Sequence, residues 1–81
     1  MRNHAYRPVS GRVHTLLTRL RASGAITEVV YRDSTNRIQS VHDCVKDLFH
    51  RAGEDFVLLG RGELVRLDQV MMVDGLVVSP G

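Results

Sequence analysis

The chain has 81 residues, 43% of them hydrophobic and 25% charged, and its formal net charge is +2. These values are typical of one folded domain and argue against a disordered chain or a second domain. The longest apolar runs fall far short of the ~20 residues of a membrane-spanning helix, and the N-terminus lacks the apolar stretch of a secretory signal. The single cysteine, Cys44, fits a reducing compartment. We therefore expect a cytoplasmic protein without a membrane segment.

The first predicted element is an α-helix over about residues 10–23, preceded by residues 1–6, which we expect to be flexible. Its apolar residues follow the i, i+3, i+4, i+7 spacing of one helical stripe: Val13, Leu16, Leu17 and Leu20. Ser10 is a suitable N-cap because its hydroxyl can accept a bond from a free backbone amide. Gly24 suits the C′ position because glycine tolerates a left-handed backbone.

The other face of this helix carries polar and basic residues, and arginines in the last turn suit the negative end of the helix dipole. Such a face is either solvent-exposed surface or a surface that contacts a partner. The exposed polar and basic residues of the helix include Arg12, Thr15, Arg19 and Arg21.

The rest of the chain, about residues 25–78, is predicted to form five or six short strands, because runs rich in Val, Ile, Leu and Thr alternate with turn residues. The strands fall at about residues 25–32, 37–41, 55–59, 63–67, 70–73 and 76–78. Residues 33–36 form a turn cluster, and Asp74-Gly75 is a two-residue hairpin signal. Val65 and Leu67 are expected to face the core.

Residues 43–53 differ from this pattern and are predicted to form a short helix or helical turn. Four apolar residues again follow helical spacing: Val45, Leu48, Phe49 and Ala52. Asp43 would be the N-cap of this helix, and Gly53 would end it. The whole pattern predicts an α+β, mainly β domain, a small twisted barrel with an N-terminal helix laid over one end.

No motif brings a nucleophile together with a base, or pairs two acids, so we expect neither an enzyme nor a catalytic residue. His42, Cys44 and His50 could be taken for metal ligands, but their spacing matches no established zinc pattern, and no bound metal is expected. A glycine-rich phosphate loop is also absent from the sequence, so no cofactor is expected.

Binding is the class of function that remains, and ten of the eleven basic residues are arginine, which favours an anionic partner. Arginines at strand ends or beside turns could meet at one rim of the barrel and contact a phosphate backbone: Arg32, Arg37, Arg61 and Arg66. The aromatic residues are too few for a base-stacking platform, and Phe49 and Phe56 are expected in the core.

Four strings along the chain carry a family resemblance. The first is Tyr6-Arg7-Pro8-Val9, and the most specific is Glu63-Leu64-Val65-Arg66-Leu67-Asp68-Gln69-Val70. Between them lie Val29-Val30-Tyr31-Arg32-Asp33 and Glu54-Asp55-Phe56-Val57-Leu58. In this order, over about residues 6–79, the strings resemble the Rho-binding antiterminator (Rof-like) family, small Sm-like proteins that bind the bacterial transcription terminator Rho.

The resemblance implies one Sm-like domain over residues 1–81, here expected to be a monomer, and a regulator of transcription termination that occupies the RNA-binding surface of Rho. In that family the helix makes much of the contact, which assigns the exposed helix residues given above to the interface. The family's helix is acidic, however, whereas Ser10-Gly11-Arg12-Val13-His14 contains no acid. Because a basic groove would repel these arginines, either the contact or the partner differs.

A second resemblance leaves an alternative open. Gly60-Arg61-Gly62 is similar to the Arg-Gly step that lines an RNA-binding pore in Sm proteins, although such a pair is more often only a turn. Under this alternative the chain is a Sm-type RNA-binding protein that uses the four arginines at the barrel rim.

Overall fold

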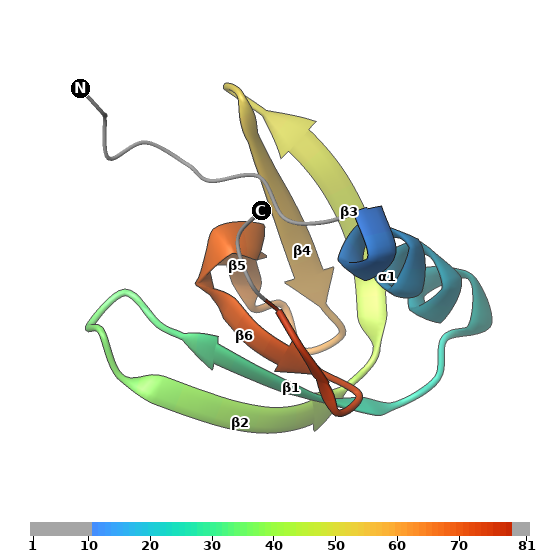
Figure 1. Cartoon of the computed structure of the whole chain (residues 1–81), viewed down its shortest axis with the longest axis horizontal. Coiled ribbons are helices and arrows are strands. Elements are labelled where there is room, and N and C mark those ends of the chain that lie inside the picture. The colour runs from blue at the N-terminus through green and yellow to red at the C-terminus, as the bar shows by residue number, and fades with distance from the viewer. Residues whose placement is uncertain (1–10, 79–81) are drawn as a thin grey trace.

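The computed structural model describes residues 11–78, so the predicted cap at Ser10 and the expected flexibility of residues 1–6 lie outside the described residues. Figure 1 shows one helix followed by a series of short strands. In chain order these are α1 (Gly11–Ser23), β1 (Thr27–Arg32), β2 (Ile38–Asp43), β3 (Val45–Arg51), β4 (Glu54–Leu59), β5 (Leu64–Arg66), the 3-10 helix η1 (Leu67–Gln69), β6 (Val70–Val73) and β7 (Leu76–Val77).

The strands form two antiparallel sheets, with the orders β2-β1-β6-β7 and β3-β4-β5. Cys44 alone separates β2 from β3, and at this residue the chain passes from one sheet into the other. Strands β2 and β3 can therefore be regarded as two halves of one bent strand. In Figure 1 β1 and β2 run along the bottom while β3 and β4 stand upright above them. The predicted class, α+β and mainly β with an N-terminal helix, is confirmed, although the described sheets do not close into a barrel.

Helix α1 packs on the sheets through the predicted apolar stripe and lies against β3. Val13, Leu17 and Leu20 are buried in the core, and Leu16 packs against it while partly exposed. The helix ends as predicted, because Gly24 has a φ of +70° and its N–H donates to the Leu20 carbonyl at 2.9 Å. The stripe therefore fixes which helix face remains open to solvent.

Two further details of the strand prediction are confirmed. Val65 and Leu67 are buried in the core. Asp74 and Gly75 both have positive φ, 50° and 81°, and join β6 to β7 as a two-residue hairpin turn. The predicted strand at residues 63–67 is shorter than expected, because η1 begins at Leu67.

The predicted helix or helical turn over residues 43–53 is wrong, because Val45–Arg51 within this segment form strand β3, which pairs with β4. A bulge at Lys46 shifts the register between Val45 and Asp47. Inward-facing residues are normally two apart on a strand, but the extra residue puts Val45 and Leu48, three apart, on the core side. The bulge thus produces a helix-like spacing.

The predicted ends of that helix have other roles. The Asp43 carboxylate accepts hydrogen bonds from the backbone N–H groups of Cys44 (2.7 Å) and Arg61 (2.9 Å). Gly53 and Ala52 have φ values of 81° and 54° and form the tight turn between β3 and β4.

The expected place of the phenylalanines is also wrong. Phe49 and Phe56 are cross-strand partners that stack on each other with ring centroids 5.5 Å apart, but neither belongs to the buried core. Arg51 lies over the Phe49 ring, 5.6 Å from its centroid. Among the aromatic residues at positions 11–78, Tyr31 is the buried one, with 3% of its surface exposed.

Candidate partner-binding site

The open side of α1 brings together three of the four residues predicted to contact a partner. Arg12, Thr15, Leu16 and Arg19, which we call the helix face, line a shallow depression of about 430 Å³. Their positions, i, i+3, i+4 and i+7, place them on one stripe of the helix, beside the buried one. Arg12, Thr15 and Arg19 are exposed and Leu16 is half-buried. An apolar centre therefore lies between two cations.

The two arginines of the helix face make no ion pair or hydrogen bond to any side chain within residues 11–78. Arg21, the fourth predicted residue, behaves differently. Its Nε lies 3.3 Å from Asp47 Oδ1 on β3, and both side chains are about half exposed. Such exposed pairs contribute at most about 1 kcal/mol, so this contact orients the end of α1 rather than holding it.

A second concave region lies where the turn between β1 and β2 faces β4 and β5. We call this region the inter-sheet pocket; it has a volume of about 580 Å³. Its charged lining residues are Arg32, Asp33, Glu54, Glu63 and Arg66. Two of the four arginines proposed for RNA contact thus line one pocket, while Arg37 and Arg61 are not among its lining residues.

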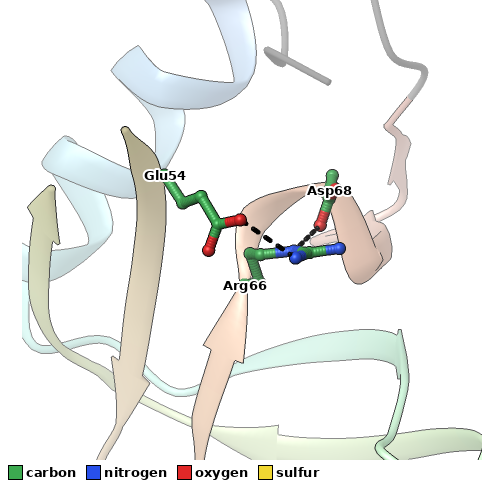
Figure 2. Close-up of polar contacts among 3 residues, drawn as sticks. All are labelled: Glu54, Arg66 and Asp68. Atoms are coloured by element: carbon green, nitrogen blue, oxygen red, sulfur yellow. Dashed lines mark hydrogen bonds and ion pairs between the residues drawn. The ribbon is translucent and has the colours of Figure 1, made fainter. Parts of the chain in front are cut away.

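Arg66, which lines this pocket, is held by two carboxylates, as Figure 2 shows. Its Nε donates to Asp68 Oδ1 at 2.6 Å, and its Nη1 donates to Glu54 Oε2 at 3.2 Å. The hydrogen bond to Asp68 and the charges of both acids raise the pKa of the guanidinium. Because two negative charges face one positive charge, the group of three carries a net negative charge.

Arg61 and Arg37 are exposed but lie in different surroundings. The Arg61 Nε is 3.6 Å from Asp43 Oδ2, the same oxygen that accepts its backbone N–H. That backbone hydrogen bond, more than the charge of Arg61, lowers the pKa of Asp43. Arg37 lies in the turn between β1 and β2, where its backbone closes the turn with Asp33. The sequence thus places four arginines at turns, but the fold does not gather them into one rim.

Sequence reasoning does not single out three acidic residues in and beside the inter-sheet pocket: Glu54, Glu63 and Asp68. Burial of the Tyr31 hydroxyl, followed by its hydrogen bond to the Glu63 carboxylate, raises the pKa of Tyr31. The signal for Asp68 is its closeness to Arg66, since only one residue separates the two in the chain. Glu54 is twelve positions from Arg66, and only the β4–β5 register brings them together.

Within the described residues 11–78, no three His, Cys, Asp or Glu side chains are grouped so that they could hold a metal ion. Of the three candidate ligands, His50 instead pairs with Asp55, with its Nδ1 2.8 Å from Oδ1. In the same part of the chain no helix is long and apolar enough to cross a membrane.

Comparisons of this chain with protein families, with curated proteins and with solved structures give no match. The family resemblance therefore rests on the four strings in the sequence that carry it.

Proposed function

We propose that this protein is a regulator of transcription termination, which binds the terminator factor Rho through the helix face and interferes with the loading of RNA. The family resemblance supports the choice of partner. The observation that carries the choice of surface is the helix face itself, in which Arg12 and Arg19 are exposed on both sides of Leu16.

The helix face has the composition of a protein contact. A half-buried leucine between two guanidiniums offers an apolar centre with a polar rim, and arginine is enriched at protein interfaces. The two cations have no carboxylate partner within residues 11–78, so their charges are available to another molecule. The helix is also rigidly held, because the neighbouring stripe is buried in the core.

The sign of the charge specifies what the partner must present. A basic helix face is repelled by a groove that binds phosphate, so the contact requires carboxylates or carbonyl oxygens opposite Arg12 and Arg19. We therefore propose an acidic or carbonyl-rich surface of Rho, beside the RNA-binding groove, as the place of contact. The bound protein would then keep RNA out of the groove by steric overlap, and it would not have to compete with RNA for the positive charges of the groove.

The ion pairs of Arg61 and Arg66, two of the four arginines proposed for RNA contact, favour this protein contact over RNA binding. Arg66 is bound to Asp68 and Glu54, and Arg61 lies near Asp43. A phosphate approaching Arg66 would meet the two carboxylates that already neutralise it.

The test measures affinity for purified Rho and for single-stranded RNA across a series of salt concentrations. The first variant combines Arg12→Glu with Arg19→Glu, and a matched control combines Arg37→Glu with Arg51→Glu. Each pair removes two exposed arginines and changes the net charge equally. Exposed substitutions usually change stability by no more than about 0.5 kcal/mol, so both variants should remain folded.

The proposal expects wild type and the control variant to bind Rho alike, and the helix variant to bind Rho at least tenfold more weakly. Wild type that binds RNA tightly and Rho not at all would contradict the proposal. In that case each phosphate contact that a variant removes should lower the slope of log affinity against log salt by about one. A variant that combines Arg61→Glu with Arg66→Glu then shows whether the rim is responsible.

A further inference from the structure

Strand β5 lies at an open edge of its sheet. It pairs with β4 on one side, and the order β3-β4-β5 places no described strand on the other side. Edge strands in proteins are commonly protected from added strands by Lys, Pro or a bulge. The three residues of β5 are Leu64, Val65 and Arg66, and the charge of Arg66 is taken up by Glu54 and Asp68. Leu64 leaves 51% of its surface exposed.

The pairing with β4 determines which backbone groups of β5 are open. In an antiparallel pair, residues that exchange hydrogen bonds alternate with residues whose N–H and C=O point away. The Leu59 N–H donates to the Glu63 carbonyl at 2.9 Å, which makes these two a bonded pair. The next pair in the register, Leu58 and Leu64, is then non-bonded. The N–H and C=O of Leu64 therefore point toward the open edge.

The open edge borders the inter-sheet pocket, because all three β5 residues are among the residues that line it. The acids lining the pocket are Asp33, Glu54 and Glu63, against the bases Arg32 and Arg66. Asp68 further neutralises Arg66. On a chain with a net charge of +2, this region therefore carries an excess of negative charge.

We propose that β5 accepts an extended segment of a partner protein as an additional strand, and that an Arg or Lys side chain of this segment enters the inter-sheet pocket near Glu54 and Glu63. The backbone groups of Leu64 supply a pair of strand hydrogen bonds, as in other cases of strand addition. The pocket supplies selectivity for a cation by charge complementarity. This site is separate from the helix face, and the proposal does not depend on Rho.

The test uses a synthetic probe, the capped peptide Thr-Val-Arg-Val-Thr, with isotope-labelled protein observed by nuclear magnetic resonance. Two further peptides serve as comparisons: one carries Glu in place of Arg, and the other carries N-methylated amides that cannot donate strand hydrogen bonds. We expect the Arg peptide to shift the amide signals of Leu64 and Arg66 and to slow hydrogen exchange at Leu64. The Glu peptide and the methylated peptide should bind at least several-fold more weakly.

Protein variants separate the edge from the rest of the surface. Leu64→Pro removes an N–H that points outward, so it should abolish binding without breaking the β4–β5 ladder. Val77→Pro is the matched control: Val77 is exposed on β7, and the bond from the Val78 N–H to the Met71 carbonyl makes its own N–H point outward too. Glu54→Gln with Glu63→Gln should weaken binding of the Arg peptide and remove its preference over the Glu peptide.

Three results would overturn the proposal: no binding of the Arg peptide up to about 1 mM, the weak end of specific affinities; equal binding of the methylated peptide; or equal effects of Leu64→Pro and Val77→Pro. If Leu64→Pro does not fold, the comparison between the Arg peptide and its methylated form on wild-type protein still decides. Weaker Rho binding by the helix-face variant would leave this result unchanged.

Discussion

A Cβ atom at position 60 would lie 2.6 Å from Asp43 Oδ1, closer than real Cβ atoms approach an oxygen. Gly60 thus allows the turn between β4 and β5 to close against the bend between β2 and β3. At this point the Gly60 N–H donates to the Cys44 carbonyl, and the Arg61 N–H donates to Asp43, each at 2.9 Å. Two hydrogen bonds thus connect this turn to the bend, one to the Cys44 backbone carbonyl and one to the Asp43 carboxylate, beside a residue without a side chain.

We therefore expect Gly60→Ala to lower the free energy of unfolding by about 1–3 kcal/mol, the usual cost of overpacking a tight contact. Urea denaturation measures this change. Gly11→Ala is the matched control, because a Cβ at Gly11 meets nothing within 4 Å and alanine favours the helix. Equal stability of Gly60→Ala and wild type would show that the Asp43 side chain moves aside for the added Cβ at little cost.

The anchoring of α1 gives a second prediction. Leu17 is 1% exposed, so Leu17→Ala removes a fully buried side chain and should cost about 2–5 kcal/mol. Thr18→Ala, one residue further along the exposed side of the helix, should change stability little. The measurement is the thermal melting temperature of both variants. A shift of less than a degree for Leu17→Ala would contradict the packing of the helix.

The turn between β3 and β4 gives a third prediction. Ala52 has a φ of 54°, a left-handed backbone that costs an alanine energy, whereas Asn with Gly is the preferred pair in such turns. Ala52→Asn should therefore raise the free energy of unfolding by about 0.5–1 kcal/mol. Asn36 has a φ of 67°, so Asn36→Ala should lower the free energy of unfolding. Urea midpoints measure both, and a lower midpoint for Ala52→Asn would contradict the assigned turn.

The sequence predicts α1 and most strands because their patterns are local. The helix stripe and the Asp74-Gly75 turn each depend on residues a few positions apart, and both are confirmed. The prediction of a helix fails at strand β3 because a bulge at Lys46 alters the spacing of its buried residues. A bulge depends on the partner strand, so the sequence of this segment alone does not reveal its position.

The sequence predicts the helix face better than it predicts the inter-sheet pocket. Arg12, Thr15 and Arg19 share a face because helical geometry alone puts them there. Arg21 is a candidate through its charge, but the pairing with Asp47 depends on how α1 lies against β3. Residues of β1, β4, β5, η1 and two turns line the inter-sheet pocket, although these elements are far apart in sequence. Only the β4–β5 register shows that Glu54 meets Arg66.

The last prediction concerns acid sensitivity at Asp33. Its Oδ1 accepts bonds from the Thr35 hydroxyl (2.7 Å) and from the N–H groups of Thr35 and Arg37 (2.9 Å each). Its Oδ2 accepts from Gln39 at 2.8 Å. The Thr35 hydroxyl, followed by Arg37 and Gln39, holds the pKa of Asp33 well below its ordinary value. A carboxyl group with a lowered pKa in the folded state stabilises that state when ionised.

The stabilisation is complete above the pKa of an unfolded aspartate, about 3.9, and is lost as pH falls from there toward the lower pKa of the folded state. Asp33→Asn should therefore have a lower urea midpoint than wild type at pH 7, and the difference should shrink below about pH 4. Thr35→Val keeps the backbone N–H but removes the hydroxyl donor. In a protein that carries Thr35→Val, adding Asp33→Asn should therefore lower the urea midpoint by less than it does in wild type. A difference that stays constant from about pH 7 to about pH 3 would mean that Asp33 is not held in its ionised form by this turn.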